Sequence, residues 1–224
     1  MPDARVPVVI AYGQWDVAPW LAQFRAADPA RTFLVYGGED QPLPERYYLT
    51  CWKPDPAIFR RRPAPLLISS PGAGVDHIMK ADPPAGVPVI RIVDADLTGR
   101  MVEYVVLHAL YHLRQMTHYR AAQAAMRWDQ RLQPAAREVT VGILGFGEMG
   151  QAAARGLQAV GFPVAGWSRT ARTVEGIATY SGEAGLAPFL AATDILVNLL
   201  PSTPATRGLI DRALIAGLHR PGPL

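Results

Sequence analysis

The sequence contains a single cysteine, Cys51, in 224 residues, so no disulfide can form within the chain. This scarcity fits a reducing compartment, and we expect a cytoplasmic protein. The chain also has no apolar run long enough to cross a bilayer. Its first residues have neither the long apolar segment nor the small-residue cleavage site of a signal peptide. These absences predict a protein without a membrane partner.

A concentrated basic surface is missing too. The formal net charge is +3 and the pI is near 9.2, yet the only run of arginines is at 60–62. Because no basic stretch is interleaved with aromatic residues, we expect no nucleic-acid partner. A modest positive charge suits an enzyme with anionic ligands equally well. Hydrophobic residues make up 50% of the chain, which allows a sizeable core.

A set of metal ligands is also lacking. His108 and His112 lie four residues apart in a segment with helical spacing, as metal-binding histidines can. The chain has no glutamate where the H-E-x-x-H pattern needs one, and it offers no clear third ligand. We therefore predict no metal site. A packing or surface role is the favoured alternative for both histidines.

The first part of the chain alternates between strand-like and helix-like segments. Apolar and β-branched runs predict strands at residues 6–12, 31–36, 46–52, 65–70 and 87–93. Helical spacing covers residues 15–27, with shorter helical pieces near 56–61 and 75–81. Such alternation predicts a parallel sheet with covered faces. We assign residues 1–95 to a flavodoxin-like α/β domain on the substrate side.

The small-residue loop at 71–76 follows the fourth predicted strand of this domain. Parallel sheets bind ligands at the carboxyl ends of their strands, so its free N–H groups could hold a carboxylate. A tight turn into a helix, with Asp76 in the first helical turn, explains the same residues without a ligand. Taken alone, the turn is the better explanation.

The second half of the chain is organised around VTVGILGFGEMG, residues 139–150. A buried strand at 139–144 is followed by Gly145, Gly147 and Gly150, and then by a segment with helical spacing. In such a G-x-G-x-x-G turn the first glycine permits the tight turn. The second lets the backbone approach a pyrophosphate, and the third lets helix and strand pack closely. The helix N-terminus then favours phosphate groups. A glycine-rich turn in some other α/β protein is the competing interpretation.

Flanking segments extend this motif into a Rossmann-like domain, which we assign to residues 96–224. It begins with a long linking helix at 96–119. Beyond the motif, strands are predicted at 162–167, 177–180 and 194–200, and helices at 186–192 and 206–218. The fold class is therefore α/β, with two parallel-sheet domains.

The end of the second Rossmann strand predicts which cofactor is preferred. NAD-specific sheets place an acidic residue there to bind the ribose 2′-hydroxyl. This chain has Ser168, Arg169 and Thr170 instead, with Arg172 close by. A hydroxyl and a guanidinium group match a 2′-phosphate, so we predict NADP(H) over NAD(H). The alternative is that Arg169 simply points into solvent.

At this point the sequence resembles the D-isomer-specific 2-hydroxyacid dehydrogenases, in particular the glyoxylate/hydroxypyruvate reductase branch. The matching pieces keep the family's order and spacing over most of the chain. They are GAGVD (72–76), MVEYVVLHAL (101–110), VGILGFGEMG (141–150), GFPVAGWSRT (161–170) and ILVNLLPSTPATRGLID (195–211), with weaker similarity at CWKPD (51–55).

The resemblance implies roles for individual residues. Ala73 and Gly74 would offer N–H groups to the substrate carboxylate, and Trp52 would border the substrate pocket. The cofactor would be held in three places. The pyrophosphate would meet Phe146, Gly147, Glu148 and Met149. The adenosine ribose would meet Ser168, Arg169 and Thr170. The cofactor cleft would be lined by Leu200, Pro201, Ser202 and Thr206.

The family's catalytic arginine, glutamate and histidine would all lie beyond Leu224. We therefore expect no catalytic residue within this chain, a Rossmann domain that is incomplete at its C-terminal end, and no turnover from the chain alone. The strand at 194–200 would be an unprotected apolar edge, which favours aggregation or pairing with another chain. The family also implies a homodimer for the full-length protein.

The resulting hypothesis is an NADPH-dependent reductase of a small 2-oxo acid such as glyoxylate or hydroxypyruvate. A non-catalytic dinucleotide-binding module is the alternative. A Rossmann reductase of imines or β-hydroxy acids is disfavoured, because those proteins typically begin with the glycine motif, and here an α/β domain and a long helix precede it.

Overall fold

The computed structural model describes residues 6–218. The chain divides into two compact units, the first ending at Asp94 and the second beginning at Ala95. Each unit contains one parallel sheet. No helix in the described part of the chain combines the length and apolar character needed to cross a membrane.

The first unit contains a five-stranded parallel sheet in the order β2-β1-β3-β4-β5. This is the flavodoxin-like order, in which the first strand lies inside the sheet. Three short helices accompany it. The strands are β1 (Val8–Ala11), β2 (Phe33–Val35), β3 (Tyr48–Cys51), β4 (Leu67–Ser70) and β5 (Val89–Arg91), and the helices are α1 (Ala18–Ala27), α2 (Ala57–Arg60) and α3 (Asp76–Met79).

The centre of this sheet is apolar because its strands are covered on both faces. Val9 pairs with Leu49 and Leu49 with Ile68, and all three side chains are buried. Since parallel strands in register end together, the loops after β1, β3 and β4 emerge at the same end of the sheet, the carboxyl end of its strands. The loop at 71–76, which follows β4, lies at that end.

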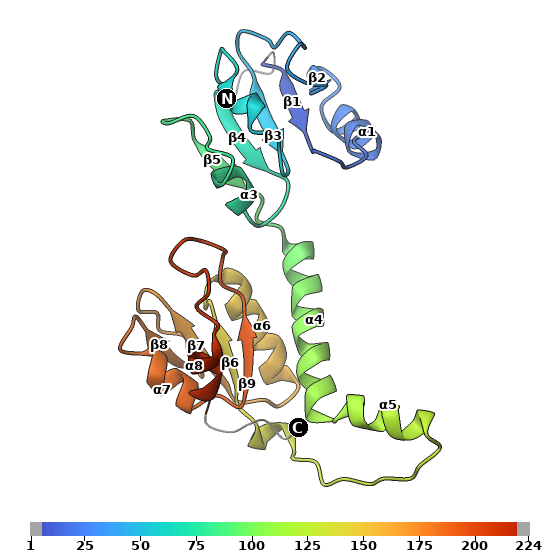
Figure 1. The fold of residues 1–224 in the computed structure, drawn as a ribbon, viewed down its shortest axis with the longest axis vertical. Coiled ribbons are helices and arrows are strands. Elements are labelled where there is room, and N and C mark those ends of the chain that lie inside the picture. Colours follow the sequence, from blue (N-terminus) through green and yellow to red (C-terminus); the bar gives the residue numbers. More distant parts are fainter. Residues whose placement is uncertain (1–5, 219–224) are drawn as a thin grey trace. The chain divides into compact units, whose positions relative to one another are not determined.

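The second unit contains a four-stranded parallel sheet in the order β8-β7-β6-β9, with β6 at its centre beside β7 and β9 (Figure 1). In order of sequence these are strands 3-2-1-4, the first four of the six-stranded Rossmann order. The strands are β6 (Val141–Leu144), β7 (Val164–Ser168), β8 (Ala178–Ser181) and β9 (Ile195–Asn198). The helices are α4 (Ala95–Leu113), α5 (Met116–Ala124), η1 (Ala136–Glu138), α6 (Glu148–Ala159), α7 (Leu186–Ala191) and α8 (Arg212–Ala216). The two sheets confirm the predicted α/β fold class.

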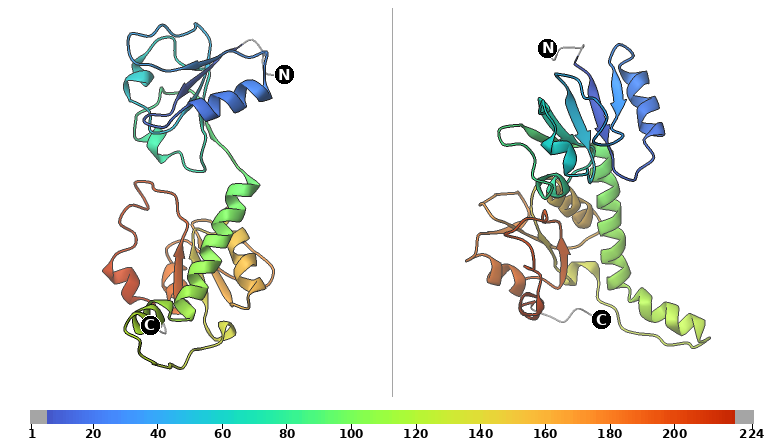
Figure 2. Two further views of the ribbon diagram at one scale, coloured as in Figure 1. Left: turned by 90° about the vertical axis from the view of Figure 1, so that its right-hand side faces the viewer. Right: turned by 45° about the horizontal axis from the view of Figure 1, so that its top comes forward.

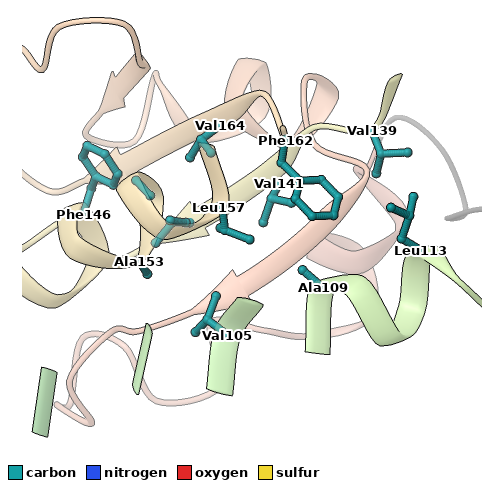
Figure 3. Packing of buried hydrophobic residues seen from close by; sticks show 12 residues of the cluster. Val105, Ala109, Leu113, Val139, Val141, Phe146, Ala153, Leu157, Phe162 and Val164 are labelled. Carbon is teal, nitrogen blue, oxygen red and sulfur yellow. The ribbon is translucent and has the colours of Figure 1, made fainter. Parts of the chain in front are cut away.

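Helix α4 packs along α6 and builds the core on that side of the sheet. Figure 3 shows Val105 and Ala109 of α4 on the side of the helix that faces Ala153 and Leu157 of α6, with Leu113 nearer Val139. All six are buried. The helices approach closely because α6 carries Gly156, where a Cβ would lie 2.5 Å from Val102.

The helix predicted at 96–119 is two helices, and this correction has a local cause. Helix α4 ends at Leu113, Gln115 has a left-handed backbone (φ 48°), and α5 begins at Met116. A right-handed helix cannot pass through that conformation. Figures 1 and 2 show α5 and the loop after it extending away from the sheet of the second unit.

The last predicted helix is also shorter than its sequence pattern. Helix α8 begins at Arg212 rather than near 206, because Asp211 is its N-cap and accepts a hydrogen bond from the Leu214 amide at 2.8 Å. Residues 200–210 instead form a loop at the end of β9.

Candidate dinucleotide-binding site

The turn between β6 and α6 requires glycine at its first position. Gly145 has φ +104°, a region that L side chains rarely adopt. A Cβ there would lie 2.7 Å from the Leu199 carbonyl carbon and the Leu200 nitrogen. The turn therefore lies tightly against the end of β9.

The other two glycines of the motif differ from each other. A Cβ on Gly150 would overlap the Gly145 carbonyl oxygen, so the start of α6 packs directly on the turn. Gly147 has no heavy atom of the protein within 4 Å of its Cβ position, and its φ of −81° suits any residue. Neither packing nor a positive φ therefore requires glycine at 147. Glycine is acceptable there as the N-cap of α6, and it leaves the backbone open to a ligand.

Helix α6 points its N-terminus into this turn. Its first N–H groups, those of Glu148 and Met149, have no acceptor within the helix. They carry the positive end of the helix dipole, which favours an anion. The turn can thus receive a diphosphate.

Phe146 lies in the turn but is engaged within the protein. Its amide donates to the Trp167 carbonyl at 2.9 Å. Its ring is buried, and a Cβ on Gly166 of β7 would overlap it. Neither its N–H nor its ring is available to a ligand, so the pyrophosphate contact implied by the family resemblance would have to come from its neighbours.

At the carboxyl end of β7, the Ser168 hydroxyl donates to the Thr170 carbonyl at 2.8 Å and tightens the chain after the strand. Arg169, Thr170 and Arg172 are exposed. Within residues 6–218, no carboxylate forms an ion pair with Arg169 or Arg172. This strand end therefore presents hydroxyl and guanidinium groups to solvent.

The loop after β9 borders an open pocket of about 310 Å³. Its lining includes the four residues predicted for the cofactor cleft, Leu200, Pro201, Ser202 and Thr206. Leu144 pairs with Asn198, and the Leu199 amide donates to the Leu144 carbonyl at 2.8 Å. The loop therefore starts beside the glycine turn.

Thr206 fixes the shape of this loop through its hydroxyl group. The Oγ1 atom donates to the Pro201 carbonyl at 2.5 Å and accepts from the Thr203 amide at 2.8 Å. These bonds join residues three and five positions apart in the chain. Thr206 is thus a structural member of the pocket wall.

Sequence reasoning missed the other lining residues of the pocket, among them two with polar side chains, Asn198 and Arg207. Asn198 accepts a hydrogen bond from the Leu200 amide at 3.1 Å. A polar side chain at the carboxyl end of an inner strand is a signal that could have identified it. Arg207 has no comparable signal, because its place in the pocket depends on the loop conformation.

In the first unit, Trp52 and the loop at 71–76 lie together at the end of the sheet. The Ser70 hydroxyl donates to the Gly74 carbonyl at 2.8 Å and accepts from the Gly72 amide at 3.2 Å. A Cβ on Gly72 would lie 2.6 Å from the Trp52 ring. The predicted substrate residues Trp52, Ala73 and Gly74 are thus neighbours around one loop.

The described part of the chain contains no group of three or more histidine, cysteine, aspartate or glutamate side chains that could hold a metal ion. His108 is exposed on α4 and packs on Tyr104, with ring centroids 4.3 Å apart. His112 is exposed near the end of the same helix.

These features define a dinucleotide-binding protein of the Rossmann type, preceded by a flavodoxin-like unit. The family model for the NAD-binding domain of D-isomer specific 2-hydroxyacid dehydrogenases matches residues 106–222. The chain belongs to this family, as the sequence resemblance predicted.

Individual relatives agree with this assignment. Glyoxylate/hydroxypyruvate reductase A of Photorhabdus laumondii is 38% identical over 94% of this chain and 69% of its own length. The protein of the same name from Yersinia enterocolitica is 31% identical over 95% of the chain and 69% of its own length.

Solved structures of the family share the fold. An NADPH-dependent glyoxylate/hydroxypyruvate reductase from Sinorhizobium meliloti, crystallised with NADP and sulfate, gives a TM-score of 0.87 at 42% identity. The match covers 97% of this chain and 69% of the S. meliloti protein. A D-isomer specific 2-hydroxyacid dehydrogenase from Xanthobacter autotrophicus, crystallised with NADPH and MES, gives a TM-score of 0.88 at 34% identity. The match covers 95% of this chain and 69% of the X. autotrophicus protein.

Proposed function

We propose that this chain supplies the cofactor site and part of the substrate site of an NADPH-dependent reductase of a small 2-oxo acid. Glyoxylate and hydroxypyruvate are the candidate substrates. The observation that carries the proposal is the open backbone at Gly147 together with the helix N-terminus beside it, where a diphosphate can approach the first amides of α6. The names of the relatives support the reaction class.

The preference for NADP(H) is supported at the end of β7. Ser168, Arg169 and Thr170 provide hydroxyl and guanidinium groups where an NAD-specific sheet would provide a carboxylate. A guanidinium group can bind a phosphate in a bidentate manner. The relatives from S. meliloti and X. autotrophicus were crystallised with NADP and NADPH respectively.

When bound, the cofactor would supply the hydride, and the chain would orient it. The amides of Gly147, Glu148 and Met149 would meet the diphosphate. Residues 168–170 would face the adenosine ribose. The pocket residues Leu200, Pro201, Ser202 and Thr206 would border the remainder of the cofactor.

The substrate carboxylate would be met by the amides of Ala73 and Gly74. The nearby Asp76 carboxylate would oppose an anion, since its Oδ1 lies 3.2 Å from the Cβ position of Gly74. Lys80 forms an exposed ion pair with Asp76 at 3.5 Å and offsets part of that repulsion. Trp52 would form the apolar border of the same site.

Titration of the chain with NADPH and NADH, followed by nucleotide fluorescence, tests the cofactor site. We expect NADPH to bind at least tenfold more tightly than NADH. Equal affinity for both would refute the assignment of Ser168 and Arg169, and no binding of either would refute the proposal. Glyoxylate turnover distinguishes an active reductase from a module that binds the nucleotide without chemistry. The absence of turnover from this chain alone stays a prediction.

We also propose that the protein pairs with a second copy through the segment after α5. Met126, Trp128 and Leu132 are 95%, 91% and 98% exposed, which is unusual for large apolar side chains so close together in one segment. Asp129 lies 3.2 Å from His118 of α5, which holds this segment against that helix, and 3.4 Å from Arg127 within the segment itself. The homodimer that the family resemblance implies would bury these apolar side chains between its two copies.

Light scattering during size exclusion tests the dimer. We expect Trp128→Ser to shift the protein toward monomer over a concentration series. Leu66→Ser, which changes a 40% exposed apolar side chain in the first unit, should leave the mass unchanged. A monomeric parent protein would contradict the proposal.

A further inference from the structure

The imidazole of His77 lies against the indole of Trp52. The two ring centroids are 4.2 Å apart and the planes are tilted by 51°. His77 Nε2 is buried and has no hydrogen-bond partner among the described residues. Burying an unpaired polar atom is unfavourable, so packing alone would favour an apolar ring at this position.

Trp52 in turn lies against the backbone of the proposed carboxylate loop. A Cβ on Gly72 would be 2.6 Å from Cζ3 and 3.2 Å from Cη2 of the indole. Trp15 stacks on the same indole, with ring centroids 5.1 Å apart and planes 25° apart. The indole is therefore held by aromatic neighbours and itself supports Gly72.

The Ser70 side chain fixes both ends of the loop between β4 and α3. The Ser70 hydroxyl bonds to the Gly72 amide and to the Gly74 carbonyl, which brings those two residues together. The position of Ala73 between them depends on how closely Gly72 approaches the indole. A rotation of the indole would therefore move the amides of Ala73 and Gly74.

The geometry points to His77 as a positioning residue for 2-oxo acid binding: its ring holds the Trp52 indole against Gly72 and so keeps the Ala73 and Gly74 amides directed at the substrate carboxylate. This inference rests on the proposed function, since it deepens the substrate site named there. The link between His77 and the loop is made by ring packing, not by proton transfer.

Calorimetric titration with oxamate, an unreactive 2-oxo acid analogue, in the presence of NADPH tests the effect on binding. We expect His77→Ala to weaken oxamate binding about tenfold, because it leaves a void beside the indole. His77→Phe keeps a ring there and should rescue affinity to within about twofold of the parent. His108→Ala is the matched control, since it removes a ring packed on Tyr104 at a similar distance of 4.3 Å.

A spectroscopic measurement follows the indole directly and needs no substrate. Fluorine NMR of protein labelled with 5-fluorotryptophan would give a Trp52 signal, assigned by its loss in Trp52→Phe. We expect His77→Ala to broaden or split that signal, and His77→Phe to retain one sharp signal. The Trp167 signal should stay unchanged in both variants, because this residue lies in the second unit.

The two measurements separate the inference from the proposed function. If the parent protein binds NADPH but not oxamate, the assignment of the substrate site fails, and with it the role of His77 in binding. If oxamate binds and His77→Ala changes neither its affinity nor the Trp52 signal, only the positioning role fails. Equal losses in the Ala and Phe variants would overturn it too, because the ring would then not be the group that matters.

Discussion

Gly147→Ala provides the most direct test of the dinucleotide site. The new methyl group would enter space that no protein atom occupies within 4 Å. The backbone at 147 has φ −81° and ψ −158°, which alanine adopts without strain. The substitution therefore adds an obstacle to a ligand and almost none to folding.

The expected change in folding stability is small because two effects oppose each other. Gly147 is the N-cap of α6, where alanine is less favourable than glycine by roughly 0.5–1 kcal/mol. Replacing glycine reduces the entropy of the unfolded chain, which stabilises by about 0.4–1 kcal/mol. We expect a net change in the free energy of unfolding below ~1 kcal/mol.

The expected loss in cofactor affinity is larger. The methyl group would keep a diphosphate from the amides of the turn, and a hydrogen bond to a charged group contributes about 1.5–3 kcal/mol. Since about 1.4 kcal/mol corresponds to a tenfold change in affinity, the dissociation constant for NADPH should rise roughly 10- to 100-fold.

Fluorescence titration with NADPH and thermal melting by circular dichroism measure the two quantities on the same samples. Gly99→Ala is the matched control, because its Cβ position is also open and it lies in α4, outside the motif. That variant should melt slightly higher, in keeping with a gain of about 0.5–1 kcal/mol, and bind NADPH normally. A second comparison is Gly150→Ala, whose Cβ overlaps Gly145 and should lower the melting temperature.

Unchanged NADPH affinity in Gly147→Ala, with a normal melting curve, would refute the reasoning. The open space at 147 would then have no connection with the nucleotide. A large loss of stability would also count against it, because the structure gives alanine room at that position.

Three further experiments test the cofactor preference, the loop after β9 and the buried cysteine of the first unit. Ser168→Asp should reverse the preference from NADPH to NADH by placing a carboxylate beside the 2′-phosphate, whereas Gln123→Glu, which adds the same charge on α5, should leave the preference unchanged in parallel titrations. Thr206→Val removes the hydroxyl that holds Pro201 and Thr203, so NADPH affinity should fall several-fold with a loss of about 1 kcal/mol in stability, measured by denaturant titration. Burial raises the pKa of Cys51 from 9.0 to about 12, so a thiol reagent at pH 8 should label it only after unfolding. The contribution of the buried thiol to the free energy of unfolding should be complete below pH 9 and should be lost as the pH rises toward 12, because only the unfolded thiol ionises readily in that range.

The features that sequence predicts well here are those with a local physical cause. The glycine spacing of the motif fits the turn because Gly145 has a positive φ and Gly150 packs directly on the Gly145 carbonyl, both of which are local requirements. The parallel sheets follow from apolar runs separated by helical segments. The family resemblance implied that Trp52, Ala73 and Gly74 serve one substrate site. The close approach of Trp52 to Gly72 joins loops after adjacent strands and has no local signature in the sequence.

The features that sequence reasoning missed depend on contacts between distant segments. Neither glycine nor proline marks the end of α4, and Gln115 takes a left-handed conformation while it is buried. The inward direction of Phe146 depends on Gly166 in the next strand, 20 positions away in the sequence. The pocket position of Arg207 depends on the hydrogen bonds of Thr206, which no residue pattern announces.

The glycines of the second unit show how packing and binding can be told apart. At Gly142 and Gly166 the Cβ position is occupied by Thr193 and Phe146, so these glycines are explained by the protein core. At Gly150 it is occupied by the turn itself. Gly147 lies in the same structural element, yet its Cβ position is empty. Because the backbone is open at Gly147 and the first N–H groups of α6 lie directly after it, a phosphate-bearing ligand can approach this turn where it could not approach Gly142, Gly150 or Gly166.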